Sequence, residues 1–228
     1  MAVEPLDDRR FAGYRRKLIE HIRVRGIDDL AILQLFDRVP RHLFVPEGVW
    51  PRAYEDAATP IGYGQTASQP SLQALYLSVL QVTPDDTVLE IGTGSGFLTA
   101  LLALTAERVY SVERIRELSV RARAVLDQLR INNVALMVGD GTIGWRKYAP
   151  FDVIVVSAAS PSVPSSFMDQ LAEGGRLLIP VGTRKRQELM LVRREGSEIH
   201  EEIIHGACTF VPLLGQFAWA SETPEDAT

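Results

Sequence analysis

Three acidic residues, Glu90, Glu113 and Asp140, each stand at the end of a short apolar run in the middle of the chain. Segments with helical spacing separate these runs, so we expect the runs to be parallel strands. The carboxyl ends of parallel strands meet at one edge of a sheet, where α/β proteins bind ligands. Carboxylates gathered there attract cations and accept hydrogen bonds from hydroxyl and amino groups. The three residues therefore predict one ligand site.

The glycine-rich segment 92–96, Gly-Thr-Gly-Ser-Gly, directly follows Glu90-Ile91 at an expected strand-to-helix turn. A dinucleotide fingerprint requires G-x-G-x-x-G, but Phe97 stands where its last glycine would be. Glu90 would also repel a pyrophosphate, whereas it would attract a cation. S-adenosyl-L-methionine carries a sulfonium and an ammonium group. An acidic residue followed by G-x-G-x-G is the usual first motif of the methyltransferases that bind it.

The other two strand-end acids suit the remaining parts of that cofactor. Glu113 is expected to accept hydrogen bonds from both ribose hydroxyls. Asp140, followed by Gly141, is expected to accept one from the adenine amino group. One strand-end acid alone is weak support, because such residues are common. Three at successive strand ends favour a cofactor site over the alternative, an α/β fold with unrelated surface acids.

Alternating apolar strands and helices predict an α/β fold: a doubly wound sheet, mostly parallel, with antiparallel C-terminal strands. With the glycine motif, this arrangement resembles the Rossmann-like sheet of class I methyltransferases. A hairpin with its turn at Glu195-Gly196-Ser197 should close that sheet. The expected strands are 87–91, 108–112, 134–138, 153–157, 175–181, 187–194 and 200–211, and the expected helices are 71–81, 97–105, 116–129 and 165–172.

The N-terminal part is expected to form two helices, 8–24 and 28–38, and then a long ordered loop, 39–70, which contains five prolines. We assign residues 1–70 to the same domain as the cofactor-binding core 71–220, as a region that covers substrate and cofactor. The polar residues 221–228 are expected to be a frayed tail.

Within that loop, the uncharged segment Gly64-Gln65-Thr66-Ala67-Ser68-Gln69-Pro70 resembles G-Q-T-x-S-Q-P, the signature of the protein-L-isoaspartate O-methyltransferase family. The resemblance extends from about Val39 to Gly215. Its other pieces are Val39-Pro40-Arg41, Phe44-Val45-Pro46, Ala53-Tyr54 with Asp56, Leu89 to Gly96, Ser111-Val112-Glu113-Arg114, Gly139-Asp140-Gly141, Ala149-Pro150-Phe151-Asp152, Ile179-Pro180-Val181-Gly182 and Phe210-Val211-Pro212-Leu213.

The resemblance implies methyl transfer from S-adenosyl-L-methionine to the α-carboxylate of an isoaspartyl residue, which leaves S-adenosyl-L-homocysteine and begins the repair of a damaged protein. The implied partners are isoaspartyl-containing proteins and peptides. Ser68 matches the position that orients the substrate carboxylate, so it is the expected catalytic residue. The residues expected to bind the cofactor are Gln65, Thr66, Ala67, Ser68, Glu90, Gly92, Thr93, Gly94, Ser95, Glu113, Asp140 and Gly141.

Ser68 also has a purely structural interpretation, because a serine before a helix that opens with Pro70 can be its N-cap. Either Ser68 or Gln69 would then be the cap, although Ser71 is not the Glu or Gln that completes a capping box. The signature motif favours the substrate role, and both roles can hold at once.

Composition excludes several other classes of function. The net charge of −5 gives no basic surface for nucleic acid, and no apolar run is long enough to span a membrane. Cys208 is the only cysteine, so a reducing, cytoplasmic location is expected. The four histidines lack metal-ligand spacing, so no metal is expected. We expect a monomer.

Three positions depart from the family pattern: Ser71, Phe97-Leu98 and Thr209. None removes an expected cofactor ligand, but each is expected to touch the rim of the peptide groove. Two alternatives therefore remain open. One is a class I methyltransferase acting on another carboxylate, a small molecule or another peptide. The other is a catalytically silent cofactor-binding module.

Overall fold

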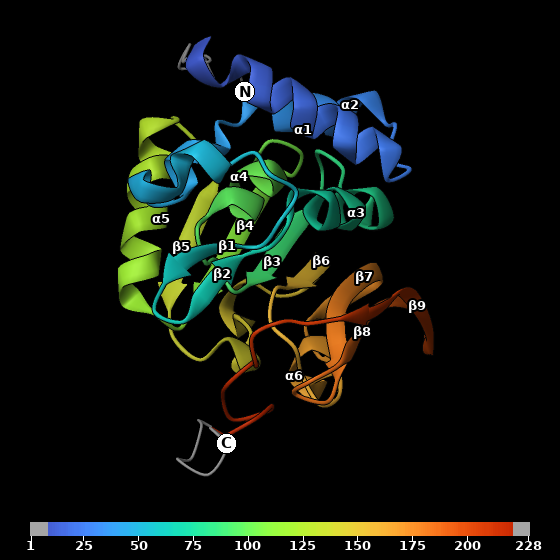
Figure 1. The fold of residues 1–228 in the computed structure, drawn as a ribbon. Helices are drawn as coiled ribbons and strands as arrows, with labels where there is room; N and C mark the ends of the chain where they lie inside the picture. The colour runs from blue at the N-terminus through green and yellow to red at the C-terminus, as the bar shows by residue number, and fades with distance from the viewer. Residues whose placement is uncertain (1–8, 221–228) are drawn as a thin grey trace.

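A computed structural model describes residues 9–220 of the chain, and its centre is a seven-stranded sheet with the strand order β5-β4-β3-β6-β7-β8-β9 (Figure 1). The expected tail 221–228 and the expected first helical residue, Asp8, lie outside the described residues. The strands are β3 Thr87–Ile91, β4 Arg108–Glu113, β5 Val134–Val138, β6 Phe151–Val156, β7 Leu171–Gly182, β8 Gln187–Glu195 and β9 Glu198–Cys208.

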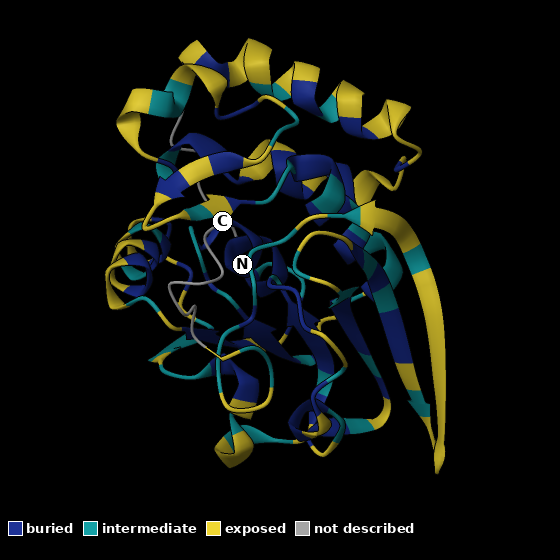
Figure 2. Ribbon diagram, turned by 60° about the horizontal axis from the view of Figure 1, so that its bottom comes forward, coloured by how far each residue is buried: buried dark blue, intermediate teal, exposed yellow. Residues whose placement is uncertain are grey.

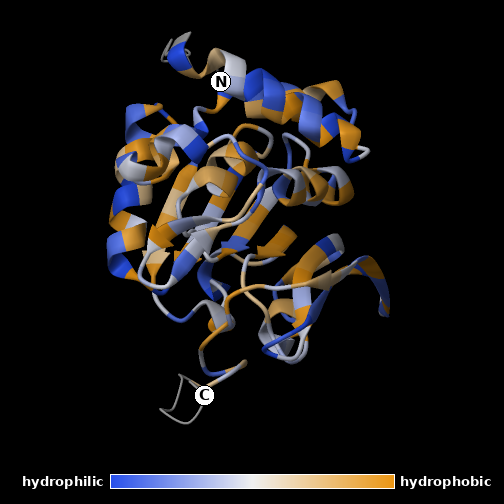
Figure 3. Ribbon diagram, viewed as in Figure 1, coloured by the Kyte–Doolittle hydropathy of each residue, from blue (hydrophilic) through white to orange (hydrophobic). Residues whose placement is uncertain are grey.

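Strands β3 to β7 pair in parallel, and β7, β8 and β9 pair antiparallel, as predicted. Helices α4 Phe97–Ala103, α5 Arg116–Gln128 and α6 Ser165–Met168 lie in the crossover connections. The central strands read as unbroken apolar runs because helices or loops cover both faces. Figure 3 shows this as hydrophobic colour in the middle of the sheet, and Figure 2 shows the same strands as buried.

The N-terminal helices α1 Ala12–Val24 and α2 Leu30–Arg38 lie over the end of the sheet occupied by α3 Pro70–Leu80 (Figure 1). A 3₁₀ turn, Arg9–Phe11, precedes α1, so the predicted helix begins later than expected. The Phe11 ring stacks on His42 at a centroid distance of 4.2 Å. The N-terminal region is thereby packed onto the segment that follows α2.

Residues 39–70 were expected to form a long ordered loop, but the structure gives them regular elements. They contain the 3₁₀ helices Arg41–Phe44 and Glu47–Arg52 and a two-stranded sheet of β1 Thr59–Gly62 and β2 Gln65–Ala67. The turn between β1 and β2 requires three successive positive φ angles, at Gly62, Tyr63 and Gly64. These strands are three and four residues long and contain Pro60, so periodicity could not show them.

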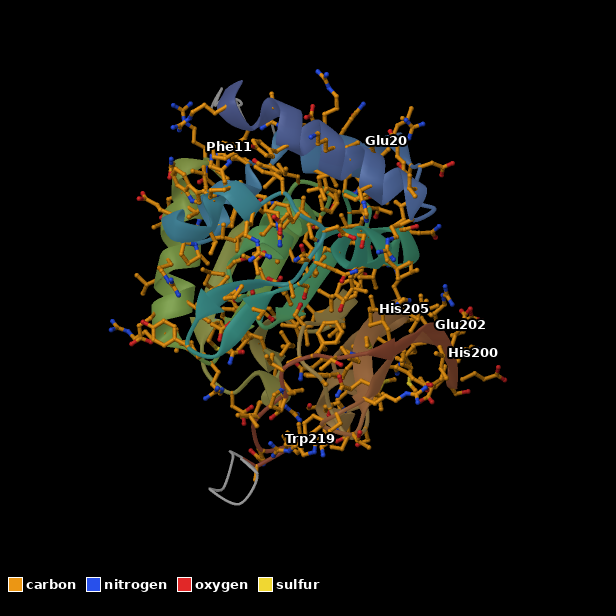
Figure 4. All side chains as sticks on the ribbon, viewed as in Figure 1. Phe11, Glu20, His200, Glu202, His205 and Trp219 are labelled. Atoms are coloured by element: carbon orange, nitrogen blue, oxygen red, sulfur yellow. The ribbon has the colours of Figure 1, made fainter. Side chains whose placement is uncertain are left out.

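Two boundaries near the C-terminus also differ from the prediction. Helix α6 ends at Met168, and β7 begins at Leu171 where the helix was expected to continue to residue 172. Strand β9 ends at Cys208 instead of residue 211, because the following residues leave the sheet. Strand β9 forms the exposed outer edge of the sheet. His200, Glu202 and His205 lie on it, far from the central strand β3 (Figure 4).

Candidate active site

A cavity opens at the carboxyl ends of β3 and β4 and encloses about 810 Å³, including the space at its mouth. Four parts of the chain contribute its walls: the hairpin strand β2 with Ser68, the glycine loop, the end of β4, and a C-terminal segment. The predicted residues in its lining are Gln65, Thr66, Ala67, Ser68, Gly92, Thr93, Gly94, Ser95, Glu113 and Gly141.

The glycine loop is shaped by its backbone. Gly92, Gly94 and Gly96 have φ angles of 93°, 52° and 86°, a region that side-chain-bearing residues rarely adopt. A Cβ on Gly96 would also lie 2.8 Å from the Cβ of Ala122 on α5. Glycine therefore permits both the turn and the close packing of α5 beneath the cavity.

Glu113 lies at the cavity, where its expected contact with a ribose could form. It lines the cavity although only 6% of its surface is exposed. Its Oε2 accepts a hydrogen bond from the Gly94 N–H at 2.8 Å, and its Oε1 accepts one from the Ile115 N–H at 2.9 Å. Each oxygen retains a second lone pair, so two hydroxyl groups of a ligand can still donate to this carboxylate.

Glu90 is absent from the lining of the cavity, and its expected contact with the cofactor stays a prediction. Its side chain is fully buried, and its Oε2 accepts hydrogen bonds from the hydroxyls of Thr99 and Ser111, each at 2.6 Å. Ser111 also shares a 2.6 Å hydrogen bond with Thr93 of the glycine loop. Burial raises the pKa of Glu90 to about 7. Glu90 thus supports the loop from below.

Asp140 is likewise absent from the cavity lining, although its neighbour Gly141 is present. Its Oδ1 accepts hydrogen bonds from the N–H and the hydroxyl of Thr142 at 2.8 and 2.6 Å. Its Oδ2 accepts one from the Gln216 N–H at 2.8 Å. The carboxylate therefore ties the C-terminal segment to the end of β5, and both of its oxygens already accept hydrogen bonds from the protein. Its expected contact with an adenine amino group stays a prediction.

Ser68 lies where two cavities meet. With Thr66, Ser157 and Val211, it lines both the larger cavity and a neighbouring one of about 400 Å³. The second cavity is walled by Ala58, Gln69, Leu72, Thr209 and Phe210 as well. A group held at Ser68 can thus face a ligand in the larger cavity while the rest of its molecule occupies the smaller one.

The structure does not use Ser68 as the N-cap of α3. The N-cap residue is Gln69, which makes no side-chain capping bond. Instead, the Asp56 carboxylate accepts hydrogen bonds from both the N–H and the hydroxyl of Ser71, each at 2.8 Å. The structural interpretation of Ser68 is therefore wrong, and the Ser68 hydroxyl remains available to a ligand.

Several residues of the site were missed in the sequence. Arg41 and Asp56 hold the Ser68–Ser71 segment, Gln73 and Ser157 line the larger cavity, and Leu214 belongs to its C-terminal wall. Arg41 and Asp56 do occur in the pieces that carry the family resemblance, which was the available signal. Their partners in that segment lie 15 to 27 residues away, so spacing alone could not identify these contacts.

The hairpin β1–β2 is held over the glycine loop by α5. Arg121 donates a 2.7 Å hydrogen bond to the Ile61 carbonyl, and its guanidinium lies 5.5 Å from the centroid of the Tyr63 ring.

In residues 9–220, no cluster of histidine, cysteine and acidic side chains has the make-up of a metal site. No helix in that same span is both long and apolar enough to cross a bilayer.

Similarity to known proteins agrees with this geometry. The family model for protein-L-isoaspartate(D-aspartate) O-methyltransferase matches residues 14–218. The protein-L-isoaspartate O-methyltransferase of Trichlorobacter lovleyi is 48% identical over 90% of this chain and 94% of its own length. That of Methanoculleus marisnigri is 49% identical over 91% of this chain and 94% of its own.

Solved structures give the same result. A protein-L-isoaspartate O-methyltransferase superposes with a TM-score of 0.78 at 29% identity, covering 90% of this chain and 67% of the other. A Plasmodium falciparum protein described as a putative member, in complex with S-adenosyl-L-homocysteine, gives a TM-score of 0.77 at 26% identity, covering 88% of this chain and 98% of the other. This chain therefore belongs to the protein-L-isoaspartate(D-aspartate) O-methyltransferase family.

Proposed function

We propose that this chain methylates the α-carboxylate of L-isoaspartyl residues in damaged proteins and peptides, and that the Ser68 hydroxyl orients that carboxylate. The observation that carries the proposal is the position of Ser68. Its hydroxyl has no capping task, because Asp56 caps α3, and it lies at the junction of two cavities. The larger cavity is the cofactor site and the smaller one is the peptide groove.

The larger cavity fits S-adenosyl-L-methionine, which supplies an electrophilic methyl group when bound. The Glu113 carboxylate is available to two hydroxyl groups, as a ribose requires. The φ angles of Gly92 and Gly94 let the backbone approach a ligand without a side chain between them. The apolar residues Leu98, Leu118 and Leu213 lie on other parts of the wall and suit the faces of an adenine ring.

The residues around Ser68 suit a substrate that brings its own nucleophile. A carboxylate with a pKa of about 4 is already ionised at neutral pH, so no general base is needed. Among the described residues that line the two cavities, there is no histidine, lysine or cysteine. A hydroxyl hydrogen bond orients the carboxylate and withdraws less electron density from the attacking oxygen than a direct contact with a cation would.

The three departures from the family pattern differ in where they lie relative to the two cavities, and this decides which of them can contact the substrate. Ser71 is turned away from the groove and binds Asp56, and Phe97 is buried against Phe36 and Phe44. Leu98 lines the cofactor cavity. Of these positions, only Thr209 lies in the wall of the smaller cavity. The departures thus change one wall residue of the peptide groove, which supports an isoaspartyl substrate.

The remaining assignments belong to the same proposal. Residues 1–70 and 71–220 act as one domain, because the first part supplies Ser68 and the second supplies Glu113 to the same cavity. The chain acts as a monomer in the cytoplasm on isoaspartyl-containing proteins and peptides, with no nucleic-acid or membrane partner. The net charge of −5 and the single cysteine support this setting.

The test uses two peptides that differ only in isoaspartate against aspartate, with labelled S-adenosyl-L-methionine and base-labile methyl ester as the readout. We expect labelling of the isoaspartyl peptide alone, and a loss of about 100-fold in kcat/KM for Ser68→Ala. Ser197→Ala, in the exposed turn between β8 and β9, is the matched control and should retain full activity.

Other outcomes favour the alternatives. If S-adenosyl-L-homocysteine binds but neither peptide is labelled, a screen of small carboxylates and other peptides tests the second substrate class. Binding without turnover on every substrate would identify a silent cofactor-binding module. Full turnover by Ser68→Ala would remove the role proposed for that hydroxyl.

A further inference from the structure

Arg41 is among the most deeply buried large side chains of the protein, with 1% of its surface exposed. It lies in the 3₁₀ helix Arg41–Phe44, outside both cavities that meet at Ser68. Placing a charged guanidinium out of water is costly unless hydrogen bonds and other interactions compensate. The contacts of Arg41 therefore indicate what the charge is used for.

The guanidinium joins three segments of the chain. Its Nε donates to the Ala53 carbonyl at 2.9 Å, its Nη1 donates to Gln73 Oε1 at 3.2 Å, and its Nη2 donates to the Ser68 carbonyl at 3.0 Å. Its Cζ lies 4.8 Å from the centroid of the Phe97 ring. Because a guanidinium is planar, these three donors fix the relative positions of their acceptors.

All three of these acceptors are neutral oxygens, so none of them cancels the positive charge. Burial lowers the pKa of Arg41 to about 10, an effect that the Asp56 carboxylate opposes, so the group stays charged at neutral pH. The charge thus lies directly behind the peptide group of the residue that faces the cavity junction.

We propose that Arg41 is a positioning residue for methyl transfer: it fixes the Ser68 backbone so that the hydroxyl faces the cavity junction, and it supplies positive charge behind the substrate carboxylate without touching it. This inference rests on the proposed function of Ser68. A cation in direct contact would lower the nucleophilicity of the carboxylate. A cation separated from it by the Ser68 peptide group attracts the anion and leaves the reacting oxygen free.

The first experiment separates geometry from charge. Arg41→Lys keeps the charge but not the planar set of three donors, so we expect kcat to fall about 10-fold while KM for the isoaspartyl peptide stays within about threefold. Arg41→Gln also removes the charge, so KM should rise a further 10-fold or so. The Kd for S-adenosyl-L-homocysteine should stay within about threefold in both.

Incomplete folding is controlled in two ways. Rates are expressed per S-adenosyl-L-homocysteine site titrated in the same sample, so a partly folded preparation still reports on the folded molecules. Arg176→Lys is the matched structural control, because Arg176 holds the carbonyls of Leu80 and Gln81 at the opposite end of α3. It should lower Tm without changing kcat or KM per site.

A double substitution tests whether Arg41 acts through Ser68. In a Ser68→Ala background, Arg41→Lys should lower kcat by less than about twofold, since the group it positions is absent. An additive loss, an unchanged kcat per site in Arg41→Lys alone, or a matching loss of S-adenosyl-L-homocysteine affinity would each overturn the inference. Wild-type turnover by Ser68→Ala would instead refute the role proposed for that hydroxyl, and a wild-type protein that does not label the isoaspartyl peptide would refute the proposed function itself.

Discussion

The two ends of helix α3 are each held by one arginine and one aspartate, but the two pairs are arranged differently. At the C-terminal end, Arg176 binds the Leu80 and Gln81 carbonyls and also contacts Asp86, at 2.6 Å. At the N-terminal end, Arg41 binds the Ser68 carbonyl, while Asp56 binds Ser71.

The difference shows how one helix combines stability with a binding site. In the C-terminal pair, each charge neutralises the other and both hold the chain, so the whole arrangement is structural. In the N-terminal pair, the charges bind different backbone groups of one short segment. Asp56 takes over the capping of α3, so the Ser68 hydroxyl is left to face the cavities.

Removing Asp56, the aspartate at the N-terminal end of α3, should have the largest effect on stability and activity. Asp56→Ala leaves the Ser71 N–H without its acceptor and removes the partner of His21, which lies 3.3 Å away on α1. We expect a loss of about 3 kcal/mol in the free energy of unfolding and at least a 10-fold loss in kcat. Urea unfolding and the peptide assay measure the two effects. If stability falls while kcat per folded molecule is unchanged, the two ends of α3 are equivalent.

Glu90 allows a pH test, because, like Arg41, it is a buried ionisable group whose hydrogen-bond partners are neutral. Burial raises its folded pKa to about 7, above its unfolded value, so its contribution to stability is fully present below about pH 4.5 and is lost as pH rises through 7. Glu90→Gln should remove about 2 kcal/mol of the stability difference between pH 5 and pH 8. Equal pH dependence in both proteins, measured by urea unfolding, would contradict this assignment.

The C-terminal pair should affect stability alone. Asp86→Ala removes an acceptor from Arg176 and from the Thr83 N–H. Because 19% of the Arg176 side chain is exposed, water can replace part of what is lost, and we expect about 1.5 kcal/mol. Activity at 25 °C should stay within about twofold of the wild-type value. A selective loss of kcat would mean that this end also tunes the site.

The smallest change is Ser71→Ala, which keeps the capped N–H and removes the hydroxyl that donates to Asp56 and accepts from Gln69 Nε2. We expect a loss of about 1 kcal/mol in stability and a kcat within about twofold of wild type. Thermal unfolding monitored by circular dichroism, beside the peptide assay, measures both. A large loss of kcat here would show that the hydroxyl, and not the cap, positions Ser68.

The sheet could be predicted from the sequence because the patterns that indicate its strands, helices and turns are local. Apolar runs, helical spacing and glycines define β3 to β6, the glycine loop and the closing hairpin within short windows. The contacts of Arg41 and Asp56 depend on the path of residues 41–71, which includes two short strands with a strained turn. No local pattern specifies that path, so both residues were known only as parts of a motif.

The acidic residues show a second limit of sequence interpretation. Glu113 is the last residue of its strand and reaches the cavity, whereas Glu90 is followed by Ile91 within its strand and is turned into the protein. Asp140 lies beyond the strand end, but Gln216 binds its carboxylate. Position near a strand end was therefore correct for all three, and side-chain direction and competing partners decided which one lines the cavity.

The bond between Asp140 and the Gln216 N–H has a consequence for how the protein is made. Residues Val211 to Leu214 form one wall of the larger cavity, and the next residues are tied back to Asp140 and Thr142. Synthesis proceeds from the N-terminus, so this wall is added after the sheet, the glycine loop and Ser68 have all been translated. A nascent chain therefore cannot complete this cavity until residues 211–217 are free to fold onto the sheet.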